Sequence, residues 1–147
     1  MKTTPSPSRW TRWKYLLNGF LIVAPFWFFY QAMTQTFPAE WPEQTIGPFT
    51  AAISPADDAP PYSHHGSYVK DFSVRFCTGC VDNIRVAYLH VGKQPAALAD
   101  DLEGILHGGA VSQNAHAPYP LSLQPDDRLW LTVQEWNGAI HHTSWPL

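Results

Sequence analysis

Hydrophobic residues form one continuous run near the start of the chain. From Leu16 to Met33 the sequence reads LLNGFLIVAPFWFFYQAM, 18 residues without a charged side chain. As an α-helix this run would be about 27 Å long, enough to cross the hydrocarbon core of a bilayer. The pattern therefore predicts a transmembrane helix, which we place at residues 15–34.

Beyond this run, apolar and polar residues alternate with the two-residue period of a half-buried β-strand. The alternation is clearest over residues 68–76, which carry three apolar side chains on one face: Phe72, Val74 and Phe76. Residues 84–91 alternate in the same way. We expect these two segments to pair as an antiparallel hairpin.

Weaker patterns suggest the elements around them. Residues 45–53 have the composition of a first strand, with Pro48 at an edge or a bulge. Residues 54–67 have the composition of a loop. Apolar residues at helical spacing predict at most one short helix, between Pro95 and His107.

The strongest hairpin pattern lies at the C-terminus. Residues 129–136 and 139–145 flank Asn137-Gly138, which favours a two-residue type I′ turn because both positions need a positive φ. That turn would place Trp130 opposite Trp145. Both faces of the hairpin would carry large apolar groups, so the face outside the core should meet a partner, the membrane surface or a neighbouring loop.

These elements predict a mostly β protein, with an N-terminal transmembrane helix and a small antiparallel β-sandwich-like domain. We assign residues 1–14 to a cytoplasmic basic tail, 15–34 to the transmembrane helix, 35–43 to a stalk and 44–147 to a periplasmic β domain. About 110 residues in the outer part suit one domain.

The charge pattern predicts the orientation of the helix. Four of the nine basic residues precede the apolar run, and no acidic residue occurs before Glu40. Basic residues favour the cytoplasmic side, so the N-terminus should be cytoplasmic and the β domain outside. Interfacial aromatic residues flank the run, with Trp41 on the outer side. A cleaved signal peptide is the alternative, but no pair of small residues suits a cleavage site.

Charge also excludes one class of partner. All twelve acidic residues lie from Glu40 onward, with only the remaining five bases. A phosphate backbone needs a cationic face, so nucleic acid is excluded as a partner of the folded part. The sequence has no Gly-rich phosphate loop, nucleophile elbow or HExxH motif, so we expect an accessory or binding protein rather than an enzyme.

Cys77 and Cys80 are the only cysteines, separated by Thr-Gly. In an oxidising compartment two thiols this close should form a disulfide, which here would close a tight turn. Thiol–disulfide exchange is an alternative, although that chemistry normally places the pair at a helix N-terminus. Metal binding by reduced thiolates is the third reading.

Histidine is abundant, with seven residues that all lie in the outer domain: His64, His65, His90, His107, His116, His141 and His142. The adjacent pairs His64-His65 and His141-His142 are candidate ligands for iron, copper or haem, because imidazole binds all of these. Neighbours in a strand point to opposite faces, so His141 and His142 cannot share an ion without a bulge. Solvated or hydrogen-bonded histidines are the simpler alternative.

Three tryptophans in the C-terminal hairpin are candidates for a partner interface: Trp130, Trp136 and Trp145. Aromatic residues dominate both cores and interfaces, so the hairpin pattern leaves the choice open.

Several segments together resemble one family: the basic N-terminus and apolar helix, GPF at 47–49, PPYSHHGSYVKDFSVRF at 60–76, IRVAYLHVG at 84–92 and RLWLTVQEWNG at 128–138. The chain is similar to small single-pass proteobacterial inner-membrane proteins associated with PepSY-type reductases in siderophore iron uptake. The resemblance implies an accessory role beside a polytopic inner-membrane protein, in reduction of a ferric siderophore or release of its iron.

Three functional hypotheses follow. The first is a membrane-anchored accessory subunit of an inner-membrane complex. The second is a periplasmic protein that binds a metal or haem through histidines. The third is a thiol-disulfide redox protein that uses Cys77 and Cys80.

Overall fold

The computed structural model describes residues 9–34, 36–97 and 103–147. The chain divides into an N-terminal unit and a β domain that begins at Phe37. In the first unit, helix α1 spans Arg9–Met33 and contains Pro25. Its segment Trp13–Met33 is long and apolar enough to cross a membrane, and none of it is buried within the protein. The helix starts six residues before the predicted span, within the segment assigned to the basic tail.

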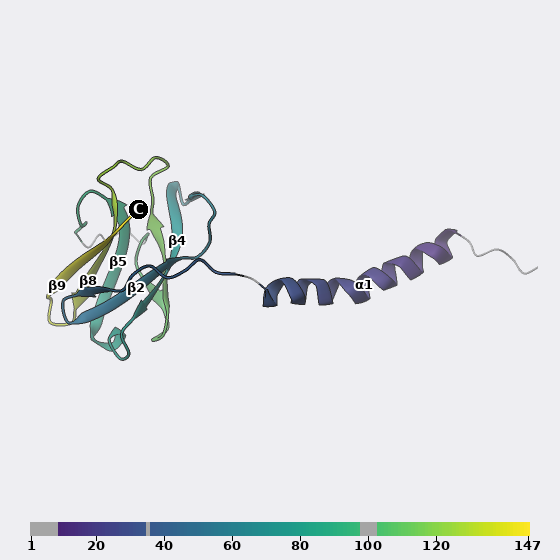
Figure 1. Ribbon diagram of the computed structural model, residues 1–147, viewed down its shortest axis with the longest axis horizontal. Coiled ribbons are helices and arrows are strands. Elements are labelled where there is room, and N and C mark those ends of the chain that lie inside the picture. Colours follow the sequence, from purple (N-terminus) through teal and green to yellow (C-terminus); the bar gives the residue numbers. More distant parts are fainter. Residues whose placement is uncertain (1–8, 35, 98–102) are drawn as a thin grey trace, which may run out of the picture. The chain divides into compact units, whose positions relative to one another are not determined.

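The β domain consists of two antiparallel sheets, as the fold class predicted (Figure 1). The larger sheet has the order β1-β2-β4-β7-β6, with β3 also paired to β4. Its strands are β1 (Gln44–Ile46), β2 (Phe49–Pro55), β3 (Tyr62–His64), β4 (Ser67–Phe76), β6 (His107–Gly108) and β7 (Gln113–Pro118). The smaller sheet has the order β5-β8-β9, formed by β5 (Ile84–Gly92), β8 (Arg128–Glu135) and β9 (Ile140–Pro146).

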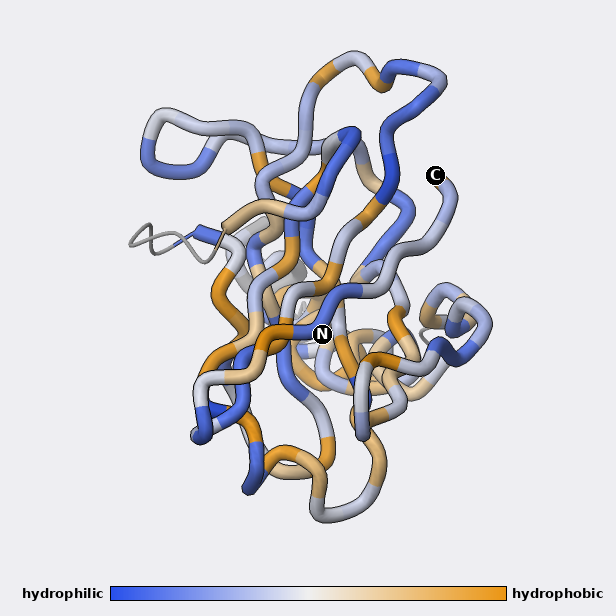
Figure 2. Tube along the Cα trace, turned by 90° about the vertical axis from the view of Figure 1, so that its left-hand side faces the viewer, coloured by the Kyte–Doolittle hydropathy of each residue, from blue (hydrophilic) through white to orange (hydrophobic). Residues whose placement is uncertain are grey.

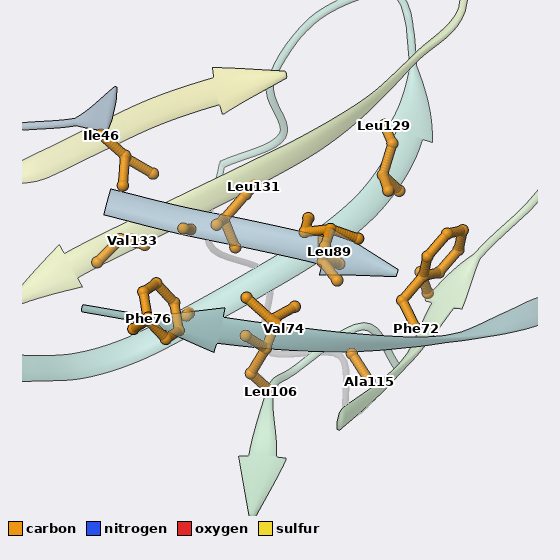
Figure 3. Close-up of a cluster of buried hydrophobic side chains, with 14 of the residues drawn as sticks. Ile46, Phe72, Val74, Phe76, Leu89, Leu106, Ala115, Leu129, Leu131 and Val133 are labelled. Atoms are coloured by element: carbon orange, nitrogen blue, oxygen red, sulfur yellow. The ribbon is translucent and has the colours of Figure 1, made fainter. Parts of the chain in front are cut away.

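The core forms where one face of each sheet meets the other. Hydrophobic and hydrophilic residues alternate along the strands (Figure 2). On β4 the predicted face is buried, and its side chains meet those of β5 and β8 (Figure 3). The fully buried residues of β8 and β9 that complete this core are Leu129, Leu131, Val133 and Trp145.

The predicted pairing of residues 68–76 with residues 84–91 is wrong. Strand β4 pairs with β2, β3 and β7, whereas β5 pairs with β8 in the other sheet. The turn closed by Cys77 and Cys80, followed by a 3₁₀-helix over Val81–Asn83, carries the chain from one sheet to the other. Alternation shows that a strand has a buried face, but it does not say which strand lies beside it.

The segment predicted as one strand over residues 45–53 is a hairpin. Ile46 pairs with Phe49 across Gly47-Pro48, and Gly47 has a φ of 58°. Glycine at the first loop position is the preference of a type II′ turn. Proline therefore sits in the turn, where its missing N–H costs no ladder hydrogen bond.

Part of the predicted loop over residues 54–67 is also a hairpin. His64 pairs with Ser67, and the two residues between them both have positive φ, 46° at His65 and 90° at Gly66. Two positive φ values define a type I′ turn. A histidine is therefore held in a backbone conformation that non-glycine residues seldom adopt.

The C-terminal hairpin exists, but its turn is longer than predicted. Glu135 donates its N–H to the carbonyl of Ala139, so three residues form the loop, of which only Gly138 has a positive φ. This is the three-residue loop with a glycine bulge. The extra loop residue shifts the register by one, so Trp130 lies opposite Ser144 rather than Trp145.

The short helix was expected between Pro95 and His107, and residues 98–102 of that range lie outside the described residues. After a turn at residues 103–104, the chain runs along β5, where Ile105 pairs with Tyr88. Leu89 donates its N–H to the carbonyl of Gly104, and Leu106 donates to the carbonyl of Ala87. This segment links the edges of the two sheets and places Glu103 beside β3.

The predicted stalk packs against the β domain from its middle onward. Trp41 donates its N–H to the carbonyl of Ile53, and its ring lies 5.9 Å from that of Phe72. The carbonyl of Pro42 accepts a hydrogen bond from the indole of Trp145 at 2.7 Å. Trp41 is therefore part of the β domain.

Candidate functional site

A group of ionisable side chains gathers on the outer face of the larger sheet. Asp71 on β4 pairs with His116 on β7, and both alternate with core residues such as Phe72, so they point away from the core. His64 on β3 and His107 on β6 lie on the same face by register. We call seven residues the histidine face: Tyr62, His64, His65, Asp71, Glu103, His107 and His116.

The first part of the histidine face is a group of three donors. Nδ1 of His64 lies 3.1 Å from Oε1 of Glu103, and Nδ1 of His65 lies 3.9 Å from the same oxygen. The two imidazoles stack with their centroids 4.1 Å apart. One ligand atom from each of the three residues fits within a span of 4.8 Å, a spacing that can hold a metal ion.

Glu103 is the least exposed member of this group. Its side chain is 12% exposed, and its Oε2 atom is buried without a hydrogen-bond partner among the described residues. A buried carboxylate oxygen without a partner loses its hydration and gains nothing in return. A bound cation would compensate that loss.

The second part joins Tyr62, Asp71 and His116. Nδ1 of His116 lies 2.6 Å from Oδ1 of Asp71, and the hydroxyl of Tyr62 donates to the same carboxylate at 3.0 Å. Burial, and then the hydrogen bond to Asp71, raise the pKa of Tyr62 above its usual value. The phenol therefore keeps its proton and remains a donor.

Ring contacts connect the two parts. The ring of His64 stacks on that of His116 at a centroid distance of 5.0 Å, and the ring of His107 lies 5.7 Å from that of His116. Four imidazoles thus form a continuous row, with Glu103 beside His64 and His65 and Asp71 beside His116. Imidazole nitrogens with carboxylate oxygens form a donor set that suits zinc, copper, iron and nickel.

The histidines of the second candidate pair lie elsewhere and point to opposite faces, as their adjacency in a strand predicted. His141 Nε2 lies 2.6 Å from Glu135, and its ring packs edge-on against Phe49. His142 Nδ1 lies 2.9 Å from the hydroxyl of Thr132. Neither is part of the histidine face.

Sequence reasoning found His64 and His65 but missed their neighbours. His116 lies on β7, for which the sequence pattern predicted no strand, although it is flanked by Ala115 and Ala117, which are both buried. The alternation of these two alanines with His116 is the sequence feature that could have predicted a strand here. Glu103 had no signal, because its position depends on how its segment crosses between the sheets.

The three candidate interface tryptophans differ in exposure. Trp145 is 1% exposed and belongs to the core, so it offers no surface to a partner. Trp130 is partly buried and donates its indole N–H to the carbonyl of Gly92. Only Trp136, 68% exposed, presents most of its side chain to the outside of the β domain.

Cys77 and Cys80 form a disulfide, as predicted. The peptide N–H of Thr50 lies 3.3 Å from the Sγ of Cys77, which ties the turn to β2. Both sulfurs are used in the bond, so neither is a thiolate ligand in this structure. The element that follows is a three-residue 3₁₀-helix, which offers no helix dipole of the kind that activates a thiol.

A neighbouring loop partly covers the outer face of the smaller sheet. Such a loop was one of the three alternatives that the sequence offered for the face of the C-terminal hairpin outside the core. Besides the bond from Trp130 to Gly92, His90 Nε2 lies 3.0 Å from the carbonyl of Gln94. His90 Nδ1 is buried without a partner among the described residues. Burial lowers the pKa of His90, and the charge of His142 lowers it further.

This partly buried imidazole predicts a pH dependence of stability. The unfolded chain binds a proton at His90 near the ordinary value of about 6.5, whereas the folded chain resists protonation. The free energy of unfolding should therefore fall as the pH drops below about 6.5, until His90 is also protonated in the folded state. Denaturant unfolding at several pH values measures this, and His90→Asn should flatten the slope. An unchanged slope in the variant would contradict the assignment.

Comparison with known proteins gives a family. A family model described as Uncharacterised conserved protein UCP029505 matches residues 9–147, which covers α1 and the entire β domain. No curated protein and no solved structure matches the chain.

Proposed function

Because the chain belongs to the family described as Uncharacterised conserved protein UCP029505, a description that names no activity, we propose its function from the histidine face. The protein is a membrane-anchored accessory protein whose β domain binds a divalent transition-metal ion. The observation that carries this proposal is the donor group of His64, His65 and Glu103, whose ligand atoms lie within 4.8 Å of one another.

The charge balance of this group supports a cation. In the described part of the chain, the ion-pair partners of Glu103 are both histidines, and no lysine or arginine forms an ion pair with it. The unpartnered Oε2 atom therefore has no fixed positive charge opposite it. A metal ion would supply that charge and use the lone pairs of both imidazoles.

The donor types indicate the class of metal. Two histidines and one carboxylate leave coordination positions open for water or another ligand, which is the pattern of non-haem iron(II) and of open zinc sites. The bonded sulfurs of Cys77 and Cys80 exclude a thiolate site in this state. We therefore propose a zinc, copper or iron ion bound through histidine nitrogens and a carboxylate oxygen, rather than a metal ion bound through cysteine sulfur.

The location of the domain is a proposal too. The helix segment Trp13–Met33 is long enough to span a membrane, and the basic residues that precede its apolar run favour a cytoplasmic N-terminus. A disulfide between Cys77 and Cys80 suits an oxidising compartment such as the periplasm. We place the histidine face there, on the outer side of the inner membrane.

A role in iron handling follows from combining this site with the resemblance to proteins associated with PepSY-type reductases. In this role the anchor holds the domain beside a polytopic inner-membrane partner, and the histidine face takes up iron released from a ferric siderophore. Exposed Trp136 is the candidate contact for that partner. Affinity purification from mild detergent should recover one stoichiometric membrane partner; recovery of the protein alone would contradict the accessory role.

Metal titration tests the binding function directly. Full-length protein in detergent should bind one Zn²⁺ ion, and the double variant H64A/H65A should lose about 100-fold or more in affinity, because removal of two ligands costs more than the roughly 10–100-fold loss seen for supporting residues. The matched control is H141A/H142A, the same change at the adjacent pair outside the histidine face. Equal losses in both variants, or no binding by the unaltered protein, would refute the proposal.

A further inference from the structure

We propose that His116 is a further ligand of the ion bound at the histidine face, and that Asp71 and Tyr62 orient it for this role. The inference rests on the proposed metal binding and extends the ligand set beyond His64, His65 and Glu103. It follows from the position of one proton, the ring contacts of His116 and the exposure of the groups involved.

The position of the proton on His116 is determined by its carboxylate neighbour. A carboxylate can only accept, so at a distance of 2.6 Å the Nδ1 atom of His116 must carry the hydrogen that Asp71 Oδ1 receives. The neutral ring then has its lone pair on Nε2. Metal-binding histidines typically show this arrangement, in which a carboxylate holds one nitrogen and the other binds the ion.

Asp71 is itself held in place by Tyr62. The phenol hydroxyl lies 3.0 and 3.1 Å from the two carboxylate oxygens. Tyr62, Asp71 and His116 therefore form one hydrogen-bonded group, in which the Tyr62 hydroxyl also lies 3.2 Å from Nδ1 of His116. In the described part of the chain, no hydrogen bond involves Nε2 of His116, which leaves that atom for an ion.

His116 lies close enough to the first group to share its ion. Its ring stacks on that of His64 with the centroids 5.0 Å apart and the planes 28° apart. Two nitrogens bound to one zinc or copper ion at about 2.0–2.1 Å each lie no more than about 4 Å apart. The proposal therefore requires the rings of His64 and His116, whose centroids are 5.0 Å apart, to turn so that one nitrogen of each faces the ion.

Stability alone does not account for this arrangement. The side chains of His116 and Asp71 are 42% and 39% exposed. Exposed charged pairs contribute little to the free energy of unfolding, because solvent screens them and side-chain entropy opposes their ordering. The arrangement of Tyr62, Asp71 and His116 is better explained by orientation of the His116 ring toward an ion than by a contribution to the free energy of unfolding.

His107 provides the internal control. Its ring lies 5.7 Å from that of His116 at a tilt of 43°, and its strand β6 pairs with β7 on the edge opposite to β4. Among the described residues no carboxylate forms an ion pair with it. A histidine that is near the site but not oriented by a carboxylate should contribute less to metal binding than His116.

Copper binding by the full-length protein in detergent tests the inference. Electron paramagnetic resonance of bound Cu²⁺ should show one coordinated nitrogen fewer in H116A than in the unaltered protein. Copper affinity should fall about 10–100-fold in H116A and in D71N, the range for removal of an orienting carboxylate. Y62F should fall less, D71E should recover part of the loss, and H107A should lower the affinity less than H116A does.

The outcomes separate this inference from the proposed function. If the unaltered protein binds Cu²⁺ and H116A shows the same spectrum and affinity, the inference is wrong and the site of His64, His65 and Glu103 stands. If the unaltered protein binds no Cu²⁺, the proposed function fails and the inference with it. Thermal unfolding of each metal-free variant should match that of the unaltered protein, which excludes loss of fold as the cause.

Discussion

Replacement of Gly104 by alanine should destabilise the β domain by about 3–5 kcal/mol, the sum of backbone strain and overpacking. Gly104 has a φ of 86°, which alanine seldom adopts. A Cβ atom there would collide with the carbonyl oxygen of Leu89, and would lie 2.7 Å from Tyr88 Cε2 and 2.9 Å from Pro118 Cδ. The collision falls on the segment whose hydrogen bonds link β5 to the larger sheet.

Gly138 is the matched control, because its φ of 91° is nearly the same and no atom lies within 4 Å of an added Cβ. Gly138→Ala should therefore cost only the backbone strain of about 1–3 kcal/mol. Denaturant unfolding of both variants measures the difference. Equal losses would show that the close contacts at Gly104 are absent in solution. Gly104→Ala should also weaken metal binding, because it displaces the neighbouring Glu103.

Phe72→Ala should cost about 3–5 kcal/mol, the usual range for truncation of a buried aromatic side chain. Phe72 is 1% exposed and contacts Trp41 on one side and Tyr119 on the other. Its loss removes core packing and also loosens the segment that joins the domain to α1. The ratio of folded to unfolded protein in a chemical denaturation series gives the value directly.

Val111→Ala is the control for this truncation, since Val111 is 79% exposed and should change the free energy of unfolding by less than about 0.5 kcal/mol. If Phe72→Ala were as mild as this control, Phe72 would not be a core residue. A second expected sign is faster proteolysis near Trp41 in the Phe72 variant.

Features set by short segments could be predicted from the sequence. The apolar run determines α1, alternation over residues 68–76 determines the buried face of β4, and the spacing of Cys77 and Cys80 brings their sulfurs together. Each of these depends on a handful of consecutive residues. They were confirmed because no distant part of the chain had to be placed first.

Features set by distant pairing could not be predicted. Whether the strand over residues 84–91 lies beside β4 or in the other sheet depends on packing across the whole domain. The turn at Asn137-Gly138 illustrates the problem at short range. The same dipeptide fits a two-residue or a three-residue loop, and the burial of Trp145 on the core face decides the register.

Only the part of the candidate site that lies in one short segment could be predicted, because the rest depends on pairing between distant strands. His64 and His65 stand out because they are adjacent, but they meet Glu103 and His116 only after β4 has paired with β3 and β7. The positive φ values of His65 and Gly66 fix the turn that carries His65, and the loop-like composition of this segment did not predict that turn. A donor group assembled from three separate segments is a property of the sheet order.

Anomalous X-ray diffraction at the zinc absorption edge, from crystals of full-length protein grown with Zn²⁺, tests the central claim most directly. The account predicts one strong peak between the imidazoles of His64 and His65 and the carboxylate of Glu103, within bonding distance of about 2.0–2.2 Å of their donor atoms. Absence of a peak at the histidine face, or a peak only at His141 or His142, would contradict it.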